Sequence, residues 1–137
     1  MDSGPALGSA LFNFSVSNGV RQNSNLSDPL SGAVYGSLFH AEEVSATGPL
    51  DGAESAADVE VYGVDLTVDE VSVITWTSPA IPPRAYRFLG FFDVDGNGDT
   101  TRDPESGDPV TLPSVNEFTI VSDTEVAVTI SFDLVYF

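Results

Sequence analysis

The sequence predicts an all-β fold, an antiparallel β-sandwich of about seven strands with two long acidic loops. Apolar side chains recur at every second position through most of the chain, and no stretch shows the 3.6-residue period of a helix. The acidic residues gather in two stretches rich in glycine and proline, residues 41–57 and 93–116. A chain of 137 residues is of ordinary single-domain size, so we expect one domain, 1–137.

The first two strands follow directly from this alternation. Residues 10–16 alternate between apolar and polar side chains and predict a half-buried strand. Asn18 and Gly19 follow it and predict a left-handed turn. Residues 32–40 predict the second strand, with one face formed by Val34, Gly36 and Leu38 and the other by Tyr35, Ser37 and Phe39.

The remaining strands are predicted to form two hairpins around one aromatic strand. Residues 59–66 and 71–77 are rich in β-branched side chains and are joined by a short link, so we expect them to pair. Residues 86–92 form the aromatic strand. Residues 118–121 and 126–136 predict the second hairpin, and alternate residues of the last strand form one unbroken apolar face.

Composition excludes several classes of function. The chain has 21 acidic residues against four arginines and no lysine, a formal net charge of −17. Binding to nucleic acid or to anionic lipid needs clustered cations, so neither is expected. Without cysteine there is no disulfide or thiol chemistry, and one histidine, His40, is too few for a histidine-based triad or a multi-histidine metal site. No apolar stretch is long enough for a membrane-spanning helix, and we expect no enzyme.

The most specific motif begins at Asp93 and reads Asp-Val-Asp-Gly-Asn-Gly-Asp. It matches the calcium-loop pattern D-x-[DN]-x-[DN]-G, in which oxygen ligands recur around a tight turn. The match ends at Pro104, where that pattern requires a glutamate. An acidic turn without an ion, or a site for another divalent ion, is the alternative. The predicted calcium ligands are Asp93, Asp95, Asn97, Asp99 and Thr101, with closure by Asp103, Glu105 or Asp108.

A second acidic cluster lies in the first long loop. Its spacing matches no ligand template, so a solvated acidic loop is favoured over a second ion site. Its members are Glu42, Glu43, Asp51, Glu54 and Asp58.

Two further features suggest binding. Trp76 with Tyr35, Tyr62 and Tyr86 would suit stacking on sugar rings, although Trp76 beside Ile74 favours core packing. The first and last strands, if they form sheet edges, would accept a strand from a second copy. Pairing within the subunit is the favoured alternative.

The segment from Tyr86 to Gly98, YRFLGFFDVDGNG, resembles small secreted bacterial β-sandwich domains of the transthyretin-like (prealbumin, Cna-B-like) kind. In these domains an aromatic strand enters an acidic loop that is followed by Gly-Asp-Pro, as at residues 107–109 here. The 31–39 strand, SGAVYGSLF, is similar to their opening strand. The resemblance covers about residues 30–112 and implies export to the cell surface. This chain departs from them in lacking the lysine of an isopeptide cross-link and in having an extra N-terminal strand.

Together these features predict an exported, calcium-binding structural or adhesive domain at the cell surface. We take the chain to follow a signal peptide that has been removed, since the N-terminus lacks a positive start and an apolar stretch. The expected partners are a second copy of the chain or a cell-surface protein or glycan. A carbohydrate-binding module is the first alternative, and a subunit that forms extracellular filaments by edge-strand addition is the second.

Overall fold

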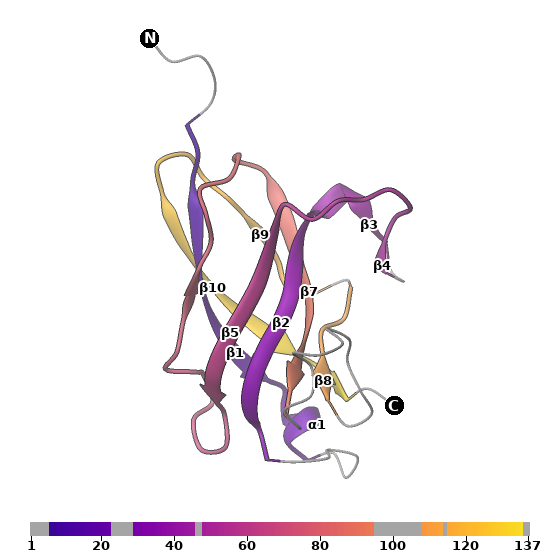
Figure 1. The fold of residues 1–137 in the computed structure, drawn as a ribbon, viewed down its shortest axis with the longest axis vertical. Helices are drawn as coiled ribbons and strands as arrows, with labels where there is room; N and C mark the ends of the chain where they lie inside the picture. The colour runs from indigo at the N-terminus through magenta and orange to yellow at the C-terminus, as the bar shows by residue number, and fades with distance from the viewer. Residues whose placement is uncertain (1–5, 23–28, 46–47, 95–107, 114, 136–137) are drawn as a thin grey trace.

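Two β-sheets pack face to face in the computed structural model, which describes residues 6–22, 29–45, 48–94, 108–113 and 115–135 (Figure 1). The smaller sheet has the order β10-β1-β6 and the larger the order β11-β8-β7-β2-β5, with β9 also pairing with β7. The predicted all-β sandwich is confirmed. The strands of the smaller sheet are β1 (Ser9–Val16), β6 (Trp76–Thr77) and β10 (Glu125–Phe132). Those of the larger are β2 (Ser31–His40), β5 (Ala57–Asp65), β7 (Ala85–Asp93), β8 (Pro109–Val110), β9 (Glu117–Thr119) and β11 (Leu134–Val135).

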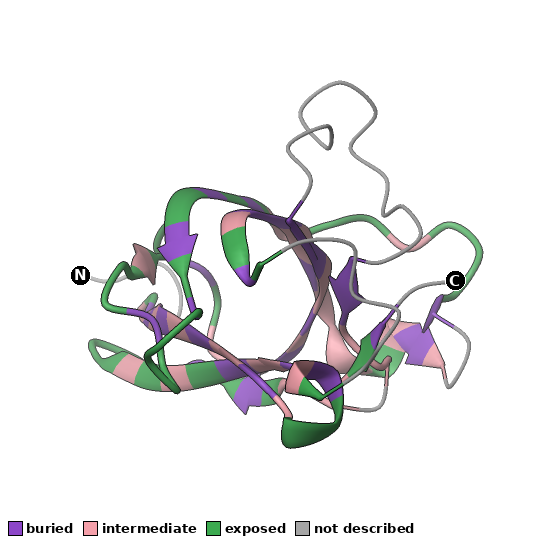
Figure 2. Ribbon diagram, turned by 90° about the horizontal axis from the view of Figure 1, so that it is seen from below, coloured by how far each residue is buried: buried purple, intermediate pink, exposed green. Residues whose placement is uncertain are grey.

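The core lies between the two sheets (Figure 2). The largest of its fully buried side chains are aromatic. In β1, every second side chain is buried, as the alternation predicts. Phe12 is at the centre, with its ring in edge-on contact with Phe88 and Phe118 at 5.9 and 5.2 Å between centroids. Trp76 also packs on Phe12, at 5.2 Å, which confirms the core-packing expectation for this side chain.

Both predicted hairpins are wrong. β5 pairs with β2, whereas the 71–77 segment lies along β1 in the other sheet. β9 pairs with β7, whereas β10 pairs with β1. Each short link therefore crosses from one sheet to the other. Alternation shows which side of a strand faces the core, but it does not show which strand lies beside it.

The first strand is interior to the smaller sheet, whereas β10, the other strand considered for strand addition, lies at the edge of that sheet. β1 runs parallel to β10 from the pair of Ser9 with Glu125 to that of Val16 with Phe132, the one parallel ladder among the described strands. Its other side is covered by residues 71–81. β1 and β10 therefore pair with each other within the subunit.

β10 and β11 link the two sheets along one side of the sandwich. β10 ends at Phe132, and after Asp133 the chain enters the larger sheet as β11, which pairs with β8. The single long strand expected over 126–136 is therefore two, and its apolar face does not continue. Leu134 is exposed and Val135 is buried, the reverse of the alternation.

Three connections differ from the loops expected. Asn18–Arg21 forms a short helix, α1, instead of a left-handed turn, and the Ser17 hydroxyl accepts a hydrogen bond from the Val20 N–H at 3.3 Å. The 41–57 stretch contains a 3-10 turn, η1 (Ala41–Glu43), and a small hairpin of β3 (Val44–Ser45) and β4 (Gly48–Pro49). The 93–116 stretch contains β8.

Two glycines face each other at the centre of the larger sheet. Gly36 of β2 and Gly90 of β7 are a cross-strand pair. A Cβ on either would lie 2.6 Å from the ring of Phe88, which is fully buried. The absence of side chains at this pair leaves the space that Phe88 fills on the core side.

Candidate metal site and outer-face groove

The calcium motif begins at the end of β7, where the structure brings two of its predicted ligands together. Asp93 is the last residue of β7 and Asp108 directly precedes β8. Both are buried, at 2% and 0% exposure. The Val94 N–H donates a hydrogen bond to Oδ1 of Asp108 at 3.3 Å, so this carboxylate lies against the peptide that follows Asp93.

Strand pairing explains why the two ends of the 94–108 segment meet. β7 and β8 are antiparallel neighbours, with Phe91 opposite Val110, so the intervening chain must return to its starting point. The sequence also permits a close approach from β2, because a Cβ on Gly32 would lie 2.0 Å from the Asp93 carbonyl oxygen. A glycine is therefore required beside the base of the acidic segment.

The other predicted ligands lie outside the described residues. Within the part of the chain that the structure describes, no three acidic or histidine side chains are grouped so as to hold a metal ion. The two carboxylates that are described suit a hard cation, since calcium binds carboxylate oxygens and a buried carboxylate needs hydrogen bonds or a positive charge. The undescribed members of the set are Asp95, Asn97, Asp99, Thr101, Asp103 and Glu105.

The second acidic cluster has other contacts. Glu42 forms an ion pair with Arg84. Asp58 accepts hydrogen bonds from the hydroxyls of Ser37 and Ser55, at 2.9 and 3.2 Å. The five acids of this cluster, all of which are described, are not brought together as a metal site.

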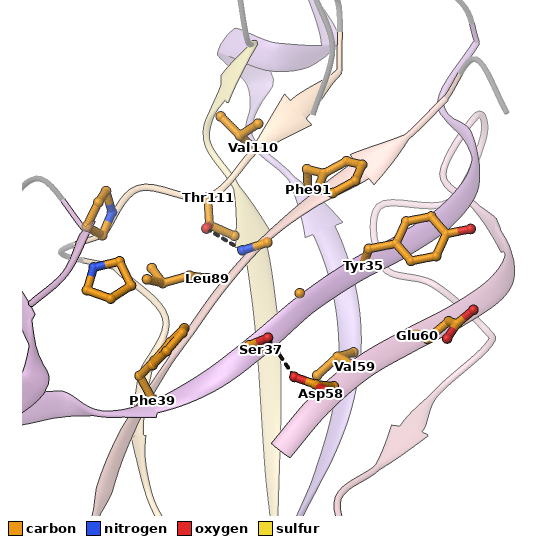
Figure 3. Close-up of a pocket in the computed structure, with 14 residues that line it drawn as sticks. Tyr35, Ser37, Phe39, Asp58, Val59, Glu60, Leu89, Phe91, Val110 and Thr111 are labelled. Atoms are coloured by element: carbon orange, nitrogen blue, oxygen red, sulfur yellow. Dashed lines mark hydrogen bonds between the residues drawn. The ribbon is translucent and has the colours of Figure 1, made fainter. Parts of the chain in front are cut away.

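A groove of about 930 Å³ lies on the outer face of the larger sheet, which sequence reasoning missed (Figure 3). Its floor comes from β2 and β7, and β5 supplies one wall. A signal for it was present, because both faces of β2 and β7 carry large apolar side chains. The lining side chains from these strands and the nearby turns are Tyr35, Ser37, Phe39, Pro49, Asp58, Val59, Glu60, Leu89, Phe91, Val110, Thr111 and Pro113, with Gly36 and Gly90.

The tyrosines do not form the flat platform that stacking on sugar rings needs. Tyr35 is buried and meets Tyr62 edge-on, at 87° between ring planes. The Tyr62 hydroxyl donates to a carboxylate oxygen of Glu60, and this hydrogen bond raises the pKa of Tyr62. Tyr86 lies in the core, with its hydroxyl donating to the Pro82 carbonyl at 2.7 Å.

The helices within the described residues are short, and none has the length and apolar character needed to cross a membrane. In comparisons with known proteins, no family model, no curated protein and no solved structure matches this chain.

Proposed function

We propose that this chain is an exported calcium-binding structural or adhesive domain, with the calcium held in the segment between β7 and β8. The observation that carries the proposal is the buried contact between Asp108 and the Val94 N–H, directly after Asp93. This contact holds together the two ends of the 94–108 segment, between β7 and β8. The resemblance to transthyretin-like domains of secreted bacterial proteins supports the proposed location at the cell surface.

Charge is the physical reason for an ion at this corner. Six of the 21 acidic residues lie within residues 93–108, against one arginine, Arg102. Like charges at this density repel one another and oppose the folded arrangement. A divalent cation bound by their oxygens replaces this repulsion with attraction, so calcium is expected to stabilise the domain.

The proposed role of the ion is to rigidify the end of the sandwich. β8 is only two residues long and joins β11 to β7, so an ion bound in the segment before β8 is expected to hold this side of the larger sheet in place. This suits a structural or adhesive module. The edge-on tyrosines do not favour a carbohydrate-binding module. Strand exchange is less favoured because β1 and β10 pair within the subunit, which leaves only β10 of these two strands at a sheet edge.

The test is a calcium titration of the purified chain. The melting temperature is expected to rise by several degrees on addition of calcium and to return on chelation with EDTA, with a smaller rise in magnesium. The double variant Asp95→Asn/Asp99→Asn is expected to lose the rise. The matched control Asp69→Asn/Glu70→Gln removes two negative charges from an exposed stretch far along the sequence and is expected to keep it. An equal rise in both variants would show a general charge effect and overturn the proposed site, as would no rise in the unmodified chain.

A further inference from the structure

The floor of the outer-face groove is apolar and only partly covered. Phe39 and Leu89 are half-buried on the outer face of β2 and β7, with Pro113 half-buried above them. Tyr35 and Phe91, with ring centroids 5.6 Å apart, are buried beside this floor in a small cluster with Ala33 and Val110. An apolar floor of this extent, separate from the core between the sheets, suits a ligand with an apolar body.

The far wall of the groove is held in place by hydrogen bonds. The Thr111 hydroxyl accepts from the Gly90 N–H at 3.0 Å, and the Thr111 N–H donates to the Gly90 carbonyl at 3.0 Å. Arg87 donates to the Pro113 carbonyl at 3.1 Å. These hydrogen bonds fix the far wall of the groove against β7.

The opposite wall carries negative charge. Asp58 and Glu60 are exposed on β5 and face the groove (Figure 3). Asp58 accepts hydrogen bonds from two serine hydroxyls, which orient the carboxylate without neutralising it. This wall is complementary to a cationic group.

The described arginines are engaged elsewhere. Arg21 donates to the backbone carbonyls of Leu66 and Asp69, at 2.6 and 2.7 Å. Arg84 and Arg87 form ion pairs with glutamates, and the chain has no lysine. None of these three arginines forms an ion pair with Asp58, whose carboxylate is exposed on the groove wall.

We propose that the groove binds a basic peptide segment of a partner protein, in which a lysine or arginine side chain meets Asp58 and Glu60 while a neighbouring apolar side chain lies on Phe39 and Leu89. Charge complementarity and an apolar floor are the two requirements, and the groove supplies both. The proposed contacts all lie on described residues of β2, β5 and β7, so the test can be made without calcium.

The test uses a fluorescein-labelled, amidated tetrapeptide of sequence Leu-Lys-Phe-Lys and measures fluorescence anisotropy with the full chain in EDTA. The unmodified chain is expected to bind it, more weakly as salt is raised. The variant Asp58→Asn/Glu60→Gln is expected to bind about tenfold more weakly. The matched control Asp69→Asn/Glu70→Gln removes the same two charges away from the groove and is expected to stay within about twofold of the unmodified chain.

Three further measurements make the test specific. Leu89→Ala is expected to weaken binding about fivefold, with an unchanged fold by circular dichroism. The uncharged peptide Leu-Gln-Phe-Gln is expected to bind at least tenfold more weakly than the lysine peptide. Equal loss in the two charge variants, equal binding of the two peptides, or equally tight competition by free phenethylamine would each overturn the proposal. Because EDTA is present throughout, failure here is distinct from failure of the calcium site.

Discussion

The side chain of Asn116 pairs with the backbone of Ser131 as a neighbouring strand would. Its Nδ2 donates to the Ser131 carbonyl and its Oδ1 accepts from the Ser131 N–H, both at 2.9 Å. Asn116 directly precedes β9 of the larger sheet, and Ser131 lies in β10 of the smaller sheet. The contact therefore joins the two sheets and satisfies backbone groups at the outer edge of β10.

Replacement of Asn116 is expected to destabilise the fold in two separable ways. Asn116→Gly removes both hydrogen bonds and is expected to cost about 1–3 kcal/mol of unfolding free energy. Asn116→Ala also places alanine at a φ of 64°, in the left-handed region, and is expected to cost about 1 kcal/mol more. Urea denaturation measures both. Asp123→Gly, at a φ of 55° in an exposed turn, is the control and is expected to be close to neutral. Equal stability of Asn116→Gly and the unmodified chain would contradict the bridging role.

Two buried serines, Ser72 and Ser78, accept hydrogen bonds from backbone N–H groups of β1 through their side-chain hydroxyls. The Ser72 hydroxyl accepts from the Phe14 N–H and the Ser78 hydroxyl from the Ala10 N–H, each at 2.9 Å. The serine N–H groups donate back to the carbonyls of the same residues, each at 2.8 Å. Each serine thus satisfies both backbone groups of one residue in β1.

Alanine at either serine is expected to leave a buried N–H of β1 without its hydrogen bond. Ser72→Ala and Ser78→Ala are each expected to lower the unfolding free energy by about 1–3 kcal/mol, measured by urea denaturation. Ser122→Ala, in an exposed turn, is expected to change it by less than about 0.5 kcal/mol. Hydrogen exchange at the Ala10 and Phe14 amides should speed up in the matching variant. Unchanged exchange there would argue against the assignment of these hydroxyls.

The pKa of Asp65 is lowered from its ordinary value of 3.8 by the hydroxyl and then by the backbone N–H of Thr67. These donors reach Oδ1 of Asp65 at 2.6 and 2.9 Å. A lowered folded-state pKa stabilises the fold above the unfolded value, about 3.9, and this stabilisation is lost as the pH falls through the folded pKa. Carboxyl NMR titration is expected to show a rise in the pKa of Asp65 in Thr67→Ala and little change in Thr67→Ser. The same pKa in all three chains would be inconsistent with this cause.

Burial at single positions was predictable from the sequence. Alternation over 10–16 correctly identified which side chains of β1 enter the core. The acidic motif placed Asp93 at the end of a strand, and the structure agrees. These features depend on local sequence alone. In a strand with alternating apolar and polar side chains, the apolar side chains all lie on one face. Glycine and acidic residues favour turns, so a strand is expected to end where they accumulate.

The choice of neighbours was not predictable in the same way. The short links after 59–66 and 118–121 are compatible with hairpin turns, yet both cross between the sheets. The Asn18-Gly19 pair is typical of a left-handed turn, yet it begins α1 because Ser17 caps the helix. The groove was not predicted from the sequence because its two walls come from segments about 50 residues apart in the chain.

By itself, therefore, the sequence determined the fold class, the buried face of the main strands and the position of the acidic motif. Only the tertiary structure decided that β1 pairs with β10, that Asn116 closes the edge of β10, and that Asp108 returns to the end of β7. The physical reason is that backbone hydrogen-bonding groups are the same in every extended strand. Their partners are selected by the packing of the whole core, which no short segment encodes.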